Sequence, residues 1–320
     1  MGAGDRSPVA NAGDPVGKYA TYHPLVRTSG RRVLLSRLAR DGFLGLSLGF
    51  LALRLLNVQP WDQSVDAYSY WITHTGPMYG TKLAGAMGAY LYSPAFAQLL
   101  TPVTWLPWPL FSSLWTALNL ALVWFLLGRW SLPAMLFLPI PFEIVSGNVH
   151  LLYAAAIVVG FRWAGTWALP LITKVTPGVG VLWFLARREW RQLALALGLT
   201  AALVAVSWLL NPQAWREWVG ILTGSSSTPI SLGPYVPVAL AWRLPIAIAL
   251  ALAAGLFNRA WLIPVAVVVA MPIIWLNSLA VLAACVPLSG ASGSMAARFA
   301  IGSRPSTAAS VMPTRAPATG

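Results

Sequence analysis

The feature that most constrains the fold of this chain is a succession of long apolar segments separated by short polar loops. Several approach the roughly 20 residues that a helix needs to cross a bilayer, and they span residues 42–57, 91–106, 108–128, 163–185, 192–210, 234–256 and 260–287. Two shorter apolar segments occupy 131–145 and 149–161. Because backbone polar groups in lipid must bond within their own element, the pattern predicts an all-α, polytopic transmembrane bundle of about nine membrane segments.

The composition excludes an ordinary soluble domain. Charged residues make up only 9% of the chain and hydrophobic residues 58%, whereas roughly a quarter of a soluble domain is charged. The formal charge of +13 comes from basic residues at the ends of apolar segments, where they set membrane orientation and meet anionic lipid headgroups. We therefore expect membrane lipid, and no nucleic acid, as a partner. The single cysteine, Cys285, excludes a disulfide framework and a cysteine-ligated metal site.

The distribution of basic residues predicts the orientation in the membrane. Arginines crowd the stretch before residue 42 and recur after 163–185, as Arg187, Arg188 and Arg191. By the positive-inside rule these segments are cytoplasmic, so we expect a multi-pass protein of the plasma membrane with its N-terminus in the cytoplasm. The loops 58–90 and 211–233 then lie outside.

Three regions follow from the same pattern. Residues 1–41 form a basic, partly disordered cytoplasmic segment, and 42–287 form the transmembrane domain. Residues 288–320, rich in Ser, Ala, Thr, Pro and Gly, form a disordered tail.

The two short segments are interpreted differently from the long ones, because they are shorter and the first contains Pro133, Pro139 and Pro141. Neither alone comfortably crosses the hydrocarbon, so they either span together or form a re-entrant pair. Irregular backbone at membrane depth is tolerated only where it is buried or lines a wet cavity. On the re-entrant interpretation, the polar residues Glu143, Asn148 and His150 face such a cavity.

Carboxylates are scarce, which narrows any acid or base chemistry to eight residues: Asp5, Asp14, Asp41, Asp62, Asp66, Glu143, Glu189 and Glu217. Asp62 and Asp66 lie in the first external loop, four residues apart, so on a helix they would share one face. The aromatic residues of this loop are interpreted as an interfacial belt; they are Tyr68, Tyr70, Trp71 and Tyr79.

Cations within the apolar segments are few. Lys174 interrupts 163–185; if that segment is one helix, the ammonium lies near the middle of the bilayer, where it must face a polar partner such as Glu143 or a bound phosphate. Arg54 is expected to snorkel toward the headgroups. Arg243 is either functional or buried against backbone carbonyls.

The order of several motifs resembles a known family. The chain reads DAYSYW and PMYG in the first external loop, then YLYSP from Tyr90 to Pro94, then SGNVHLLYAA, then LPLITKVTPGVGVLWFLARREWR. This layout, over roughly residues 45–230, resembles the polyprenyl-phosphate-sugar-dependent glycosyltransferases of actinobacteria, family eighty-seven of the GT-C type.

The resemblance implies a GT-C-like helical bundle with its active site at the outer face. It implies a polyprenyl-phosphate sugar as donor, with mannose favoured over arabinose by the same resemblance. The acceptor it implies is a cell-envelope glycolipid or polysaccharide, and no cofactor or metal is expected. Asp66, directly before the aromatic run, matches the family's catalytic base, and Asp62 is the alternative. The candidates for binding the donor phosphate or sugar are Lys174, His150, Asn148, Arg216 and Tyr92.

Two other function classes remain open at this level. A secondary transporter or lipid flippase would use Arg54, Lys174, Arg243 and Glu143 as a polar path. An inactive, truncated paralogue would keep the fold without the activity, since family members commonly carry further helices where this chain has its polar tail.

Overall fold

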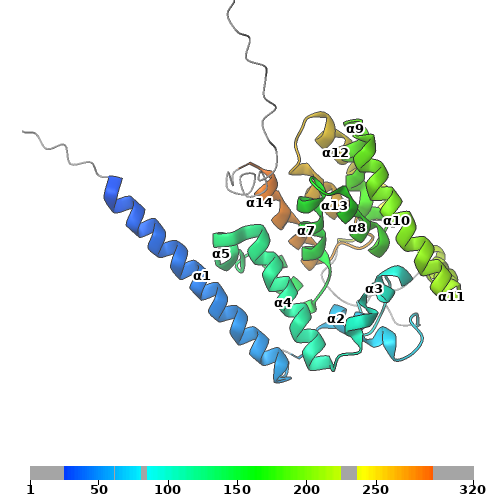
Figure 1. Cartoon of the computed structure of the whole chain (residues 1–320), viewed down its shortest axis with the longest axis horizontal. Coiled ribbons are helices and arrows are strands. Elements are labelled where there is room, and N and C mark those ends of the chain that lie inside the picture. Colours follow the sequence, from blue (N-terminus) through cyan, green and yellow to red (C-terminus); the bar gives the residue numbers. More distant parts are fainter. Residues whose placement is uncertain (1–24, 61, 81–84, 225–235, 291–320) are drawn as a thin grey trace, which may run out of the picture. The chain divides into compact units, whose positions relative to one another are not determined.

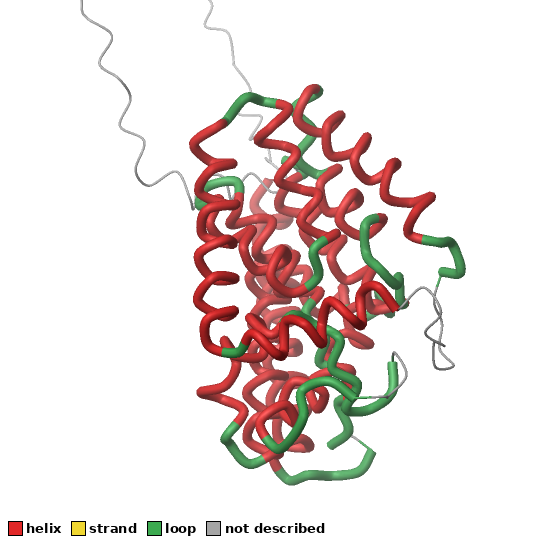
Figure 2. Tube along the Cα trace, turned by 90° about the vertical axis from the view of Figure 1, so that its right-hand side faces the viewer, coloured by secondary structure: helices red, strands yellow, loops and turns green. Residues whose placement is uncertain are grey.

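A computed structural model describes residues 25–60, 62–80, 85–224 and 236–290. Within these ranges the regular elements are all helical and no strand occurs (Figure 2). The chain up to Leu38 and the chain from Ala39 onward form separate compact units, and each is described by itself. The predicted all-α class is confirmed for the described residues, while most of the predicted tails, residues 1–24 and 291–320, lie outside them.

The first helix, α1 (Leu25–Leu55), contains both the basic segment and the first apolar segment. The boundary predicted at residue 41 is therefore not marked by a break in the backbone. At 1.5 Å per residue the 31 residues extend about 46 Å. The chain leaves the helix through Asn57, whose φ of 55° is left-handed, a conformation that asparagine tolerates better than most residues.

The first external loop is folded back onto the helices. It contains α2 (Val65–Trp71) and the 3₁₀ turn η1 (Ile72–His74). The Trp71 indole donates to the Leu106 carbonyl, and the Tyr79 hydroxyl donates to the Tyr92 carbonyl. These two bonds attach the loop to the segment that begins α3 (Pro94–Thr104) and to the one that precedes α4 (Trp108–Leu127).

The two short apolar segments form a bent pair. After α4 the chain runs through η2 (Gly128–Trp130) and α5 (Ser131–Ala134) into α6 (Pro139–Ser146), and then turns by 111° into α7 (His150–Gly160). Proline breaks an ongoing helix but is accepted in its first turn, which accounts for the short α5 and for the start of α6 at Pro139. The geometry is that of a broken span or a re-entrant loop.

The segment 163–185 is not one helix, contrary to the prediction. It consists of η3 (Ala164–Trp167), α8 (Ala168–Thr173), η4 (Thr176–Val181) and α9 (Leu182–Ala186). Lys174 is extended, with φ −137° and ψ 111°, and it ends α8. Pro177 explains part of the break, since proline lacks the amide hydrogen that would bond to the Thr173 carbonyl and its ring clashes with that carbonyl. The continuous helix from which the depth of Lys174 was predicted is therefore wrong, and the depth itself stays a prediction.

The remaining elements complete the bundle. They are α10 (Trp190–Leu210), α11 (Pro212–Gly224), α12 (Leu240–Leu256), α13 (Leu262–Val269), η6 (Leu276–Ala284) and α14 (Cys285–Leu288). In Figure 1, α11 and α3 lie at one end of α10 and α9 at the other, in agreement with the packing of these elements. Along most of its length α10 exposes leucines, together with Val206 and Trp208, as a lipid-facing helix does.

Arg243 is buried near the start of α12 and bonds only to backbone within the described residues. Its guanidinium donates to the carbonyls of Val238, Val269, Met271 and Pro272, at 2.7 to 3.0 Å. The last carbonyls of α13 lack helical partners, and a cation there is favourable. Of the two roles predicted for Arg243, the structure supports burial against carbonyls.

By length and composition, two stretches of helix could cross a membrane, Trp108–Ala134 and Trp190–Leu210, and the bent pair of α6 and α7 would be a third. These counts apply to the described residues. A helical membrane protein is thus supported, whereas nine membrane segments remain a prediction.

The turn between α6 and α7 depends on Gly147. Its φ of +69° is left-handed, and a Cβ there would lie 2.5 Å from the Ser64 Oγ and 2.7 Å from the Ala67 Cβ. We expect Gly147→Ala to lower stability by about 2 kcal/mol or more, from the left-handed backbone and the overlap together. Thermal unfolding in detergent measures the change.

Gly198, inside α10, is the matched control, since no atom lies within 4 Å of the Cβ it would gain. Gly198→Ala should stabilise by roughly 0.5–1 kcal/mol, the usual effect in a helix interior. Equal melting temperatures for Gly147→Ala and the unmodified chain would contradict the role assigned to the turn.

Candidate active site

The candidate site is built around the turn that joins α6 to α7. Its carbonyls face other elements: the Val145 oxygen accepts from Arg54 at 2.6 Å and from Ser64 at 3.1 Å, and the Gly147 oxygen accepts from the Trp115 indole at 2.6 Å. The missing side chain of Gly147 allows α2 to approach the turn. The sequence segments of α1, α2 and α4 thereby converge on one peptide turn.

Asn148 is the polar centre of this turn. Its side-chain oxygen accepts hydrogen bonds from the Tyr92 hydroxyl at 3.0 Å, the Tyr70 hydroxyl at 3.4 Å and the Val149 amide at 2.7 Å. The side chain also bonds to the Asp66 carboxylate. Since the oxygen is occupied by donors, the NH₂ group is the part that can donate to Asp66.

Asp66 lies in the first turn of α2 and is half-buried. Burial raises the pKa of its carboxyl above the ordinary value, and the negative charge of Glu143 raises it further. The charges of Lys174 and His150 and the bond from Asn148 act in the opposite direction. A carboxyl with a raised pKa accepts a proton more readily than an ordinary aspartate does, which suits a general base.

Lys174 reaches the same site from the end of α8. Its Nζ lies 4.8 Å from the centre of the Tyr92 ring, within the range of a cation–π contact. Among the described residues it forms no salt bridge within 4.0 Å. The cation acts on the Asp66 carboxyl from a distance, and the predicted direct pair between Lys174 and Glu143 is not formed.

Glu143 pairs instead with His150, and both side chains are fully buried. One carboxylate oxygen accepts from the His150 backbone amide at 2.6 Å, and the other lies 2.9 Å from the ring Nδ1. The ring Nε2 lies 3.3 Å from the hydroxyl oxygen of Ser278 in η6. Glu143 therefore caps α7 and fixes the imidazole, so both ring nitrogens of His150 already have protein partners.

Asp62 and Arg54 lie to one side of this cluster. Since α2 begins at Val65, Asp62 precedes the helix and does not share a helical face with Asp66. Its charge acts on Arg54, whose side chain is fully buried. The prediction that Arg54 snorkels to the headgroups is therefore wrong: it bonds to the α6–α7 turn.

Arg216 is not brought into the cluster. It is exposed on α11, between Trp215 and Trp218, which are buried. The Trp218 indole donates to the Leu91 carbonyl at 3.3 Å, beside Tyr92. This bond attaches α11 beside the site, and the contact of Arg216 with the donor remains a prediction.

Sequence analysis missed the role of Tyr70. It was assigned to an interfacial belt, yet it is fully buried and its hydroxyl lies 3.0 Å from that of Tyr92. The signal that could have found it is spacing, because Tyr70 lies four residues after Asp66 and hence on the same face of a helix. Ser278 gave no signal, as it lies in an apolar segment far along the chain.

A small cavity opens beside the site. It measures about 230 Å³ and is lined by parts of the external loop and by the chain before Tyr92: Ile72, Thr73, Thr75, Gly76, Pro77, Met78, Gly80, Gly88, Ala89, Tyr90 and Leu91. None of these lining residues is charged. The described residues contain no group of three His, Cys, Asp or Glu side chains that could hold a metal ion.

Comparison with known proteins identifies the family of this chain. The family model of Glycosyltransferase family 87 matches residues 90–301, about two thirds of the chain. The chain belongs to Glycosyltransferase family 87.

One curated relative is a polyprenol-phosphate-mannose-dependent α-(1-2)-phosphatidylinositol mannoside mannosyltransferase of Mycobacterium tuberculosis. It is 27% identical over 233 residues, which cover 59% of this chain and 53% of the relative. The chain therefore spans about half the length of the curated relative it matches. No solved structure matches the chain significantly.

Proposed function

We propose that this protein is a membrane glycosyltransferase that moves a sugar, mannose by preference, from a polyprenyl-phosphate donor to a glycolipid or polysaccharide acceptor at the outer face of the plasma membrane. The observation that carries the proposal is the convergence of Asp66, Asn148, Tyr92 and Lys174, from four separate segments, on one turn. Family membership supports the reaction class, and the named donor and acceptor of the relative support the substrate classes.

Asp66 is assigned as the general base. The acceptor hydroxyl oxygen attacks the anomeric carbon, its proton passes to the Asp66 carboxylate, and the bond between that carbon and the phosphate oxygen breaks. The polyprenyl phosphate leaves with the bonding electrons. An oriented carboxylate with a raised pKa is suited to the proton transfer, and the Asn148 amide holds its orientation.

Lys174 is assigned to the donor phosphate. The break in the helix at Lys174 exposes extended backbone within a predicted membrane segment, which is tolerated where it lines a polar cavity. Its ammonium rests against the Tyr92 ring without a carboxylate partner, so it can pair with the anion that forms as the phosphate departs. Tyr92 and Asn148 then bind the sugar or phosphate beside it.

The other predicted ligands have weaker grounds. His150 uses both ring nitrogens within the protein, so we assign it to orienting the turn and keep its donor contact as a prediction. Asp62 remains the alternative base. We propose that the reaction needs neither a metal ion nor a cofactor, that the N-terminus is cytoplasmic, and that the uncharged cavity beside Tyr90 receives part of the acceptor.

No described contact favours a transporter. Its polar path would link Arg54, Lys174, Arg243 and Glu143, but Arg243 bonds to four carbonyls and Glu143 bonds to His150. Two of the four side chains required for the path are thus engaged locally.

Asp66→Asn should lower turnover by a factor on the order of 10² to 10⁴, the usual contribution of a general base, with little change in donor affinity. Transfer from radiolabelled polyprenyl-phosphate mannose in membranes that contain the protein measures it. Asp62→Asn is the matched control and should retain most of the activity. If Asp66→Asn is active and Asp62→Asn is inactive, the general base is Asp62. If both variants are active, the proposed mechanism is wrong.

Lys174→Met should raise the apparent KM for the lipid donor by roughly 10- to 100-fold, which corresponds to the loss of one charge-assisted hydrogen bond. The melting temperature should remain near that of the unmodified chain. If Lys174 were structural, the variant would be unstable and its melting temperature would fall. Normal donor kinetics in a stable Lys174→Met would exclude the phosphate role.

A further inference from the structure

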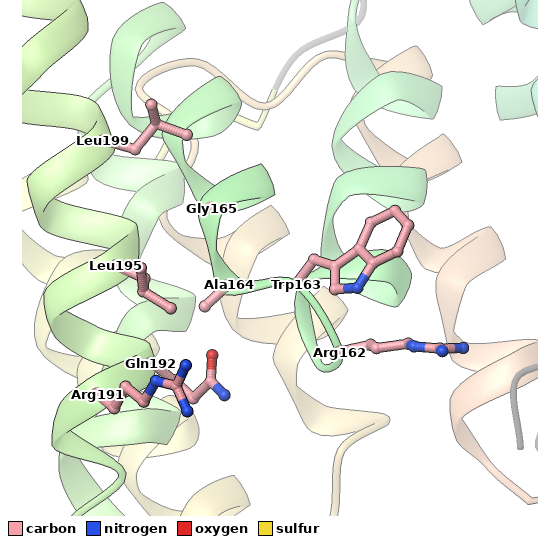
Figure 3. A pocket seen from close by; sticks show the side chains of 8 residues that line it. All are labelled: Arg162, Trp163, Ala164, Gly165, Arg191, Gln192, Leu195 and Leu199. Carbon is pink, nitrogen blue, oxygen red and sulfur yellow. The ribbon is translucent and has the colours of Figure 1, made fainter. Parts of the chain in front are cut away.

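A second cavity lies far from the candidate site, between α10 and the turn that precedes η3. It measures about 480 Å³ and is lined by residues of these two segments (Figure 3): Arg162, Trp163, Ala164, Gly165, Arg191, Gln192, Leu195 and Leu199. No carboxylate is among them. The groove is narrow beside Leu199, since a Cβ on Gly165 would lie 3.1 Å from the Leu199 Cδ2.

The lining of this groove changes from polar to apolar along α10. Arg191, Leu195 and Leu199 are spaced by four residues and so share one helical face. In Figure 3 the side chains of Arg191 and Gln192 lie at one end, and Leu195 and Leu199 follow in order along the helix. At 1.5 Å per residue, the apolar part extends about 12 Å beyond Arg191.

Charge favours an anion at the polar end. Glu189 is the nearest acidic residue in the chain, and it is paired with Arg187 at 2.7 Å. Among the described residues Arg191 has no salt bridge within 4.0 Å. The guanidinium of Arg162 lies 5.9 Å from the Trp163 ring and extends away from α10 in Figure 3, which places it on the rim.

The groove and the candidate site lie toward opposite ends of α10. Arg191 is in the first turn of this 21-residue helix, which extends about 31 Å. At its other end α10 leads into α11, whose Trp218 bonds to the Leu91 carbonyl beside Tyr92. The groove is therefore separate from the donor site proposed above, and α10 is long and apolar enough to cross a membrane.

We propose that this groove binds an anionic phospholipid. The headgroup phosphate bonds to Arg191 and Gln192, Arg162 contributes to the rim, and one acyl chain lies along Leu195 and Leu199. Arginine matches phosphate geometry with paired donors, and a basic pocket beside membrane helices suits an anionic headgroup. Trp163 also lines the groove and is 65% exposed, and exposed aromatic side chains of membrane proteins gather at the membrane interface.

The apolar half of the groove distinguishes a lipid from a free anion. A soluble phosphate would use only the Arg191 end and would leave Leu195 and Leu199 uncovered. A phospholipid covers both parts, and its acyl chain adds to affinity through the apolar area it buries.

The test is thermal unfolding of the full chain in nonionic detergent, titrated with phosphatidylglycerol. We expect a saturable rise in melting temperature. In Arg191→Gln the half-saturating lipid concentration should rise about tenfold, the effect of one lost charge-assisted hydrogen bond. Arg188→Gln removes the same charge nearby without lining the groove and should change the titration little. Leu199→Trp fills the apolar half and should weaken binding with Arg191 intact.

Three results would overturn the proposal. Phosphatidylcholine could give the same saturable shift, which would remove the role of charge. Glycerol 3-phosphate could give it at the same concentration, which would assign the site to a free phosphate. Finally, both variants, Arg191→Gln and Leu199→Trp, could titrate like the unmodified chain, which would place the lipid elsewhere. Unchanged melting temperatures without added lipid would show that the two variants are folded.

Discussion

Hydrogen bonds to the turn at Gly147 and Asn148 connect segments that are far apart in the sequence. Arg54 and Ser64 bond to the carbonyl of residue 145, Trp115 bonds to that of Gly147, and Tyr92 bonds to the Asn148 side chain. Each donor would be costly to leave unpaired in an apolar interior. The same bonds that satisfy the turn therefore place α2 and the start of α3 against it, and α2 carries Asp66 to Asn148.

The ionisable groups near this turn divide into two sets. Glu143 and His150 are fully buried and bonded to each other, so their polar atoms are satisfied within the fold. Asp66 and Lys174 are half-buried, and neither forms a direct ion pair with another described residue. Holding two such groups in a site of low polarity lowers the stability of the fold. Their presence is explained if the site binds a phosphate and accepts a proton.

Apolar patterning predicted the helical class, prolines singled out the short pair 131–145 and 149–161, and scarce charge singled out Lys174, because these are local signals. Asp66, Asn148 and Tyr92 came from the family resemblance, and their roles stay predictions. The break at Lys174 was not predicted, because the mean hydropathy of a segment carries no information on where its backbone leaves the helical conformation. Sequence analysis also misassigned Tyr70 and Arg54 to the interface: both are buried by tertiary contacts with the α6–α7 turn, which no single segment reveals.

Lys174 and Asp66 are proposed to act in one site, and the pH dependence of kcat/KM shows whether they do. Because the pKa of Asp66 is raised and Lys174 counteracts part of that rise, the acid limb should lie above the ordinary aspartate value of about 3.9. The limb should move to still higher pH in Lys174→Met and remain in place in Lys174→Arg. Superimposable acid limbs for Lys174→Met and the unmodified protein would contradict the account.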